Sequence, residues 1–159
     1  MKYSLLTFFM MIIVASGFAQ KQDKEAIKAR VAEMVAAESF SFRAETVYPQ
    51  GRPSRFLTEQ YYLLTINDKK VVCDLPYFGE AHTASLANDG GIKFNSSDFT
   101  VEKKQVKKGW SFVIKPKDNQ DIKECTLNIY DGGSANLVVV SNSRSTISYD
   151  GKIIEPVSN

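Results

Sequence analysis

Apolar and polar residues alternate with a period of two through most of this sequence. Phe40, Phe42 and Tyr48 share one parity, whereas Arg43 and Glu45 share the other. Successive side chains of a strand point to opposite faces, so this pattern predicts a half-buried β-strand. Further runs of this kind lie at residues 58–66, 69–75, 91–94, 98–106, 110–115, 124–130, 135–141 and 145–154. Together they predict about eight to ten short strands.

The connections between these runs predict how the strands pair. Most are short and rich in Gly, Asn and Asp, and consecutive strands joined by tight turns pair antiparallel. The last run offers an alternative, a hairpin around Asp150 and Gly151. An open sheet edge favours aggregation, so we expect a mainly β domain at residues 39–159, an antiparallel meander curled into a barrel or sandwich. The pattern fits both closures.

One segment departs from the period of two. Residues 20–38 predict an amphipathic helix, because the apolar positions from Ile27 to Val35 recur at helical spacing and Asp23 can cap the first turn. The stripe is rich in Ala and lacks aromatic anchors for a membrane surface. We expect the helix to pack on the sheet.

The first 19 residues predict a signal peptide. Lys2 precedes an apolar run from Leu5 to Val14, and small residues lead to a cleavage site after Ala19. The run is too short to span a bilayer, and no second apolar span follows, so the mature chain is expected to have no transmembrane segment. The protein is therefore predicted to be exported, either periplasmic or secreted. Its net charge of +2 gives no reason to expect nucleic acid as a partner.

The chain has two cysteines, Cys73 and Cys125. Each shares its strand face with apolar neighbours, so both thiols are expected to point inward. In an oxidising compartment they can form a core disulfide. The alternative is two separate buried thiols that behave as small apolar residues. Strand parity does not decide between these.

The connection between residues 75 and 91 holds the candidate functional residues. Tyr77 and Phe78 are expected either to plug an end of the core or to line a ligand entrance. Glu80 and His82, the chain's single histidine, are the parts available for a hydrolase or a metal enzyme. Such a site needs further partners that the sequence does not supply nearby, so neither a catalytic residue nor a cofactor is expected.

Several motifs in order give the chain a resemblance to a known family. LTEQYYLLTI, LPYFGEA, GGIKF, the Gly109–Trp110 step and SANLVVVSNSRSTISYDGKI span about residues 38 to 155. They resemble domain-of-unknown-function family 4251, a set of small exported bacterial proteins. The resemblance implies a β fold and export, and it implies no reaction. Arg144 belongs to the closing motif, where it can contact a ligand or, as we favour, pin a loop through hydrogen bonds to carbonyls.

These features lead to a ranked functional hypothesis. The chain is expected to be an exported, non-enzymatic domain that binds a small or apolar molecule or an envelope protein, with Tyr77, Phe78 and Trp110 near the mouth of a cavity. The alternative is a structural or interaction protein of the cell envelope with a filled core. An enzyme that uses His82 ranks third.

Overall fold

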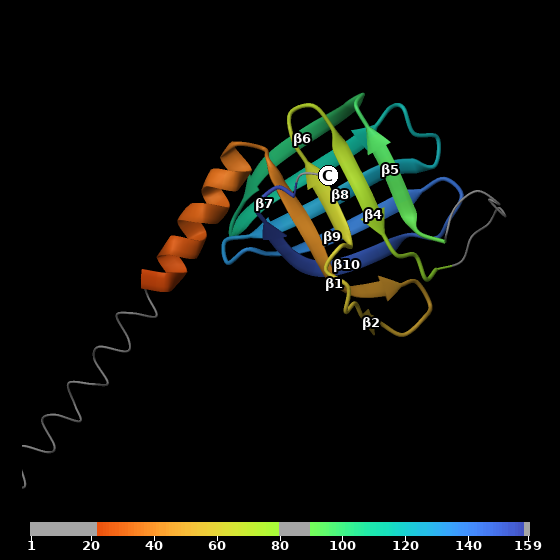
Figure 1. The fold of residues 1–159 in the computed structure, drawn as a ribbon, viewed down its shortest axis with the longest axis horizontal. Helices are drawn as coiled ribbons and strands as arrows, with labels where there is room; N and C mark the ends of the chain where they lie inside the picture. Colours follow the sequence, from red (N-terminus) through yellow and green to blue (C-terminus); the bar gives the residue numbers. More distant parts are fainter. Residues whose placement is uncertain (1–21, 80–89, 158–159) are drawn as a thin grey trace, which may run out of the picture.

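The computed structural model describes residues 22–79 and 90–157, and this part of the chain is mainly β (Figure 1). A helix at residues 22–36 precedes the strands. The strands are β1 (Phe40–Pro49), β2 (Arg55–Phe56), β3 (Leu63–Ile66), β4 (Val71–Leu75), β5 (Ile92–Ser96), β6 (Phe99–Val106), β7 (Gly109–Pro116), β8 (Ile122–Tyr130), β9 (Ser134–Ser141) and β10 (Ile147–Ile154). The prediction of a mainly β fold with one leading helix is confirmed.

The strands form one antiparallel sheet that curls into a nearly closed barrel (Figure 1). The order is β5-β4-β3-β1-β10-β9-β8-β7-β6, with β2 added to β1. Most neighbours in the sheet are neighbours in sequence, as a meander requires. The long-range exception is β1 with β10, paired from Ser41 opposite Ile154 to Pro49 opposite Ile147. This pairing joins the two halves of the meander into one continuous sheet. The curl of that sheet gives the barrel, not the sandwich (Figure 1).

Two local expectations are wrong. The run at 58–66 becomes a strand only from Leu63. That strand, β3, pairs with the first part of β1, and beyond a bulge after Ala44 the same edge of β1 pairs with β2 instead. The hairpin around Asp150 and Gly151 is absent, since β10 runs straight through both residues. A Cβ on Gly151 would lie 1.9 Å from the Arg43 carbonyl oxygen. The glycine therefore permits a close strand approach and makes no turn.

The inward faces of the strands fill the barrel with large side chains. Phe40, Phe42, Phe112, Leu137 and Tyr149 have no solvent exposure. The rings of Phe40 and Phe112 meet edge to face, with centroids 5.4 Å apart. Burial of these residues is the main stabilising contribution to the fold.

The helix projects from one end of the barrel, and the side chains that it buries there come from its second half (Figure 1). Residues 22–30 are exposed, whereas Val31, Met34 and Val35 are buried against the barrel. Ile27, the first member of the predicted stripe, keeps 48% of its surface exposed. Within residues 22–79 and 90–157, no helix is both long enough and apolar enough to cross a membrane. The predicted signal peptide falls outside these residues.

Candidate functional site

Part of the predicted site gathers at the barrel end where β4 and β9 finish. The Tyr77 hydroxyl donates a hydrogen bond to the Ser145 carbonyl at 3.1 Å. The Arg144 guanidinium carbon lies 5.4 Å from the centroid of the Tyr77 ring, and that of Arg55 lies 4.9 Å from the Phe78 ring. Cations over aromatic rings are attracted to the face of the π system, so both contacts hold the aromatic pair in place.

Arg144 lies at the centre of this end of the barrel. Its side chain is only 8% exposed, and it donates a hydrogen bond to the Gly91 carbonyl at 2.7 Å. Its Nε lies 3.4 Å from the Asp121 carboxylate. Together with Tyr77, these residues form the Arg144 cluster, which links the β4–β5, β7–β8 and β9–β10 connections. The contact with a backbone carbonyl is the one that the loop-pinning interpretation of Arg144 expects.

The carboxylate of Asp121 completes the Arg144 cluster. It accepts hydrogen bonds from Ser141 Oγ, at 2.6 Å, and from Ser143 Oγ. Burial raises the pKa of Asp121, but the two hydroxyl donors and Arg144 outweigh burial, so its pKa is lowered overall. The negative charge of Asp121 is balanced by the positive charge of Arg144 and by two hydroxyl donors. This arrangement is typical of a structural ion pair rather than of a catalytic group.

Tyr149 reaches the same end from inside the barrel. Its hydroxyl donates a hydrogen bond to the Pro76 carbonyl at 2.8 Å, and burial raises its pKa. Pro76 and Gly91, at the two ends of the β4–β5 connection, are therefore each held by a side chain from β10 or the segment before it. The predicted site residues Glu80 and His82 lie between them, outside the described residues.

Trp110 is not part of this cluster. It is the second residue of β7 and pairs with Ile129 near the end of β8, whereas Asp121 precedes the start of β8. Trp110 therefore packs half-buried against the core at the opposite end of the barrel. The prediction that Tyr77, Phe78 and Trp110 surround one cavity mouth is wrong. Tyr77 and Phe78 follow the end of β4, whereas Trp110 stands at the start of β7, and these points lie at opposite ends of the barrel.

The two cysteines lie inside the barrel as free thiols. Burial raises the pKa of Cys125 to about 12, and burial together with the nearby Cys125 raises that of Cys73 well above its usual value. The thiolate is the reactive form, so neither residue has the environment of a nucleophile. In residues 22–79 and 90–157, no cluster of three or more His, Cys, Asp or Glu side chains is arranged to hold a metal ion.

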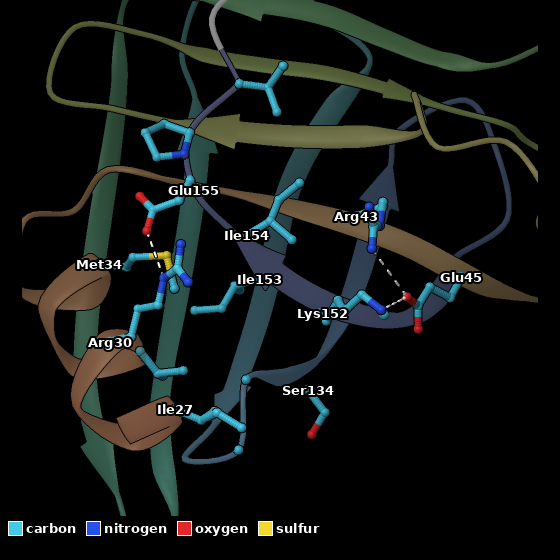
Figure 2. Close-up of a pocket in the computed structure, with 16 residues that line it drawn as sticks. Ile27, Arg30, Met34, Arg43, Glu45, Ser134, Lys152, Ile153, Ile154 and Glu155 are labelled. Atoms are coloured by element: carbon cyan, nitrogen blue, oxygen red, sulfur yellow. Dashed lines mark hydrogen bonds and ion pairs between the residues drawn. The ribbon is translucent and has the colours of Figure 1, made fainter. Parts of the chain in front are cut away.

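A pocket of about 800 Å³ lies elsewhere, between the helix, β10 and the residues that follow β10 (Figure 2). We call it the helix groove. Its apolar lining includes Ile27, Val31, Met34, Ile153, Ile154, Pro156 and Val157, and its charged lining consists of Arg30, Arg43, Glu45, Lys152 and Glu155. Its volume falls within the range of roughly 300–1,000 Å³ that is typical of small-molecule sites. A pocket of about 480 Å³ adjoins it and shares Arg43, Ile154 and Val157.

Besides β1 and β10, three parts of the chain form walls of the helix groove: the helix, the turn between β8 and β9, and the segment after β10. Ile27, Val31 and Met34 are spaced so that they face the same side of the helix. The turn between β8 and β9 lets the helix come close, since a Cβ at Gly133 would already touch Val31 Cγ2 at 3.4 Å. The segment after β10 forms the remaining wall, where the Val157 amide donates a hydrogen bond to Ser41 Oγ.

The charged residues lie on two sides of the helix groove (Figure 2). On the helix side, Arg30 Nε and Glu155 Oε1 form an ion pair at 2.9 Å. On the β1 side, Lys152 Nζ lies 2.6 Å from Glu45 Oε1, and Arg43 lies 3.9 Å from the same oxygen. Sequence reasoning missed this site because its walls come from opposite ends of the chain. The signal in the sequence is Ile27, an apolar residue one turn beyond the buried part of its stripe.

Comparison with known proteins agrees with this fold. A family model described as "Domain of unknown function (DUF4251)" matches residues 21–153. A crystal structure of a DUF4251 family protein from Bacteroides eggerthii DSM 20697 superposes with a TM-score of 0.58 at 14% sequence identity, covering 82% of this chain and 88% of the other. At this identity the likeness shows the fold alone. No curated protein matches the chain significantly. The extent of the family match shows that the chain belongs to the DUF4251 family.

Proposed function

We propose that this protein is an exported, non-enzymatic binding protein whose ligand occupies the helix groove. The observation that carries the proposal is an open pocket of ligand size with an apolar lining and charged sides, beside a barrel packed with buried side chains. The binding surface is thus an outer one, formed where the helix leaves the barrel.

The sequence supports export and relates it to the groove. Cleavage after Ala19 leaves Gln20 as the first residue of the mature chain, and the helix is already present from residue 22. The helix would therefore be the first element of the mature protein. One wall of the helix groove would lie next to the mature N-terminus.

The polar groups away from the groove support binding over catalysis. Arg144 and Asp121 are engaged with each other and with backbone or hydroxyl groups at the barrel end. Burial raises the pKa of both thiols, so Cys73 and Cys125 stay protonated at neutral pH. The two charged side chains are thus engaged in structural contacts, and the two thiols are buried in their unreactive form.

Native mass spectrometry tests the proposal. Residues 20–159 would be secreted through a bacterial periplasm, and the native mass compared with the denatured mass. We expect extra mass that disappears on denaturation and that is reduced by Ile27→Ser, which removes an apolar contact while Ser and Ile have similar helix propensities. Val106→Ser is the matched control, because Val106 is also 48% exposed but lies on β6. Equal adducts on both variants would show that the ligand sits elsewhere.

A second candidate function is docking to an envelope protein. It is favoured by Phe56, which lies on β2 and keeps 88% of its surface exposed. Single exposed apolar residues are common, so this surface needs its own test. If it docks a partner, Phe56→Ser should abolish crosslinking to that partner in cells, while Val106→Ser should leave it intact.

A further inference from the structure

We propose that the helix groove binds a monomeric fatty acid, with its alkyl chain along the helix and its carboxylate between Arg43 and Lys152. The inference rests on the proposed function, because it names the ligand class of that same groove. Both the shape and the charge distribution of the lining support this class.

The helix side of the groove suits an alkyl chain. Val31, Met34 and Ile153 are less than 10% exposed and form a continuous apolar floor, while Ile27 stands partly exposed above it. Figure 2 shows Ile27 and Met34 on the helix, with Ile153 beside them. Met is unbranched and adapts its shape to flexible apolar ligands. A chain in this position would cover the exposed part of Ile27.

The β1 side of the groove suits an anion. Lys152 and Arg43 both lie against one oxygen of Glu45, so two cations share a single carboxylate. On the helix side, by contrast, Arg30 and Glu155 form a neutral one-to-one pair. A ligand carboxylate that replaced or joined Glu45 would balance the extra cation, and the planar guanidinium of Arg43 matches carboxylate geometry.

The neighbouring charges do not cancel this preference. Asp150 lies two residues before Lys152 on β10, but it accepts a hydrogen bond from Asn136 Nδ2 at 2.9 Å and does not line the groove. Counted over its lining, the groove has three cations and two carboxylates. Because Glu45 and Glu155 balance two of the cations, the lining lacks the broad basic surface that recruits an anionic bilayer, which favours a single dissolved molecule.

The test compares three ligands that share one alkyl chain and differ in the head group. Dodecanoate, dodecanol and dodecylamine would be titrated into residues 20–159 below the concentrations at which each aggregates or separates from water. Calorimetry would give affinity, and backbone and methyl NMR shifts would give location. We expect shifts at Ile27, Ile153 and Lys152, and dodecanoate to bind about five- to tenfold more tightly than dodecanol. Dodecylamine should bind most weakly.

Two variants separate the head-group contact from the chain contact. Lys152→Glu should weaken dodecanoate binding by about tenfold and leave dodecanol binding unchanged. Lys123→Glu is its control, because Lys123 is exposed on β8 and lies outside the groove. Ile27→Ser should weaken both ligands equally, whereas Val106→Ser should weaken neither.

Each outcome decides a different statement. Equal binding of dodecanoate and dodecanol, with shifts in the groove, would overturn the fatty-acid inference and leave the groove as the ligand site. Tighter binding of dodecylamine would overturn it in the same way. The inference would also be overturned if none of the three ligands caused NMR shifts, or if the shifts were confined to other parts of the barrel. Shifts confined to other parts of the barrel, together with equal adducts on the Ile27 and Val106 variants, would in addition remove the groove from the proposed function.

Discussion

Replacing Arg144 with Ala tests whether the Arg144 cluster holds the loop end of the barrel together. The substitution removes the hydrogen bond to the Gly91 carbonyl, the ion pair with Asp121 and the cation over the Tyr77 ring. The Arg144 side chain is only 8% exposed, so water replaces few of these contacts directly. The Asp121 carboxylate is left with its hydroxyl donors alone.

The size of the effect follows from these contacts. A charged hydrogen bond lost to a buried partner costs about 1.5–3 kcal/mol, and loss of one member of a fully buried ion pair costs about 3–5 kcal/mol. Because the Asp121 side chain is 32% exposed, solvent screens part of its lost attraction. We therefore expect Arg144→Ala to lower the free energy of unfolding by about 2–3 kcal/mol, which corresponds to about 10 °C in Tm. Arg144→Lys keeps the charge and loses the planar fork, so its effect should be intermediate.

Urea unfolding followed by Trp110 fluorescence measures this cost. Arg30→Ala is the matched control, because that side chain is 66% exposed and its ion pair should contribute less than about 1 kcal/mol. Since the pKa of Asp121 is lowered on folding, its contribution is present above the ordinary carboxyl pKa and is lost as pH falls through the folded value. Asp121→Asn should therefore flatten the acid side of the stability profile. If Arg144→Ala costs no more than Arg30→Ala, the cluster does not pin the loops.

Three further predictions concern the barrel itself. Tyr149→Phe leaves a carbonyl without its buried donor and should cost about 1–2 kcal/mol in urea unfolding; an unchanged midpoint would contradict that bond. Gly151→Ala should cost more than about 3 kcal/mol or abolish folding, because its Cβ would lie 1.9 Å from a carbonyl oxygen, whereas Gly132→Ala has no atom within 4 Å and should stay within about 0.5 kcal/mol. Equal effects of the two alanines would refute the close-approach argument. Cys73 and Cys125 should react with Ellman's reagent only after unfolding, and an unfolded protein with no reactive thiol would show that they are paired.

The period of two was sufficient to locate most of the strands because each strand has one buried face. Along β8, Cys125, Leu127 and Ile129 are buried, whereas Thr126 and Asn128 between them are more exposed, as alternation requires. Lysine is common on edge strands, and most of the lysine-rich run at 103–108 lies on β6, which is at one end of the sheet order. Such features depend on local sequence alone.

Features that depend on contacts between residues far apart in the sequence could not be predicted in the same way. The alternation in β1 does not reveal that its partner is β10, near the other end of the chain, and this pairing joins the two halves of the meander into one sheet. For the same reason, Asp150 and Gly151 resembled a turn when considered alone. The Arg144 cluster was partly foreseen, since Arg144 and Tyr77 were both singled out. Its carboxylate, Asp121, was not, because nothing local distinguishes it from a turn residue.

The two ends of the barrel differ in how firmly their elements are held, and this difference favours the helix groove as the binding surface. At the loop end, buried hydrogen bonds from Arg144 and Tyr149 fix the backbone. At the other end, the helix is anchored by three buried side chains and by exposed ion pairs, which contribute little. A helix of this length is marginally stable alone, so its first two turns depend on what packs beside them. An apolar ligand in the groove would supply that packing, and binding would therefore order the element that forms the site.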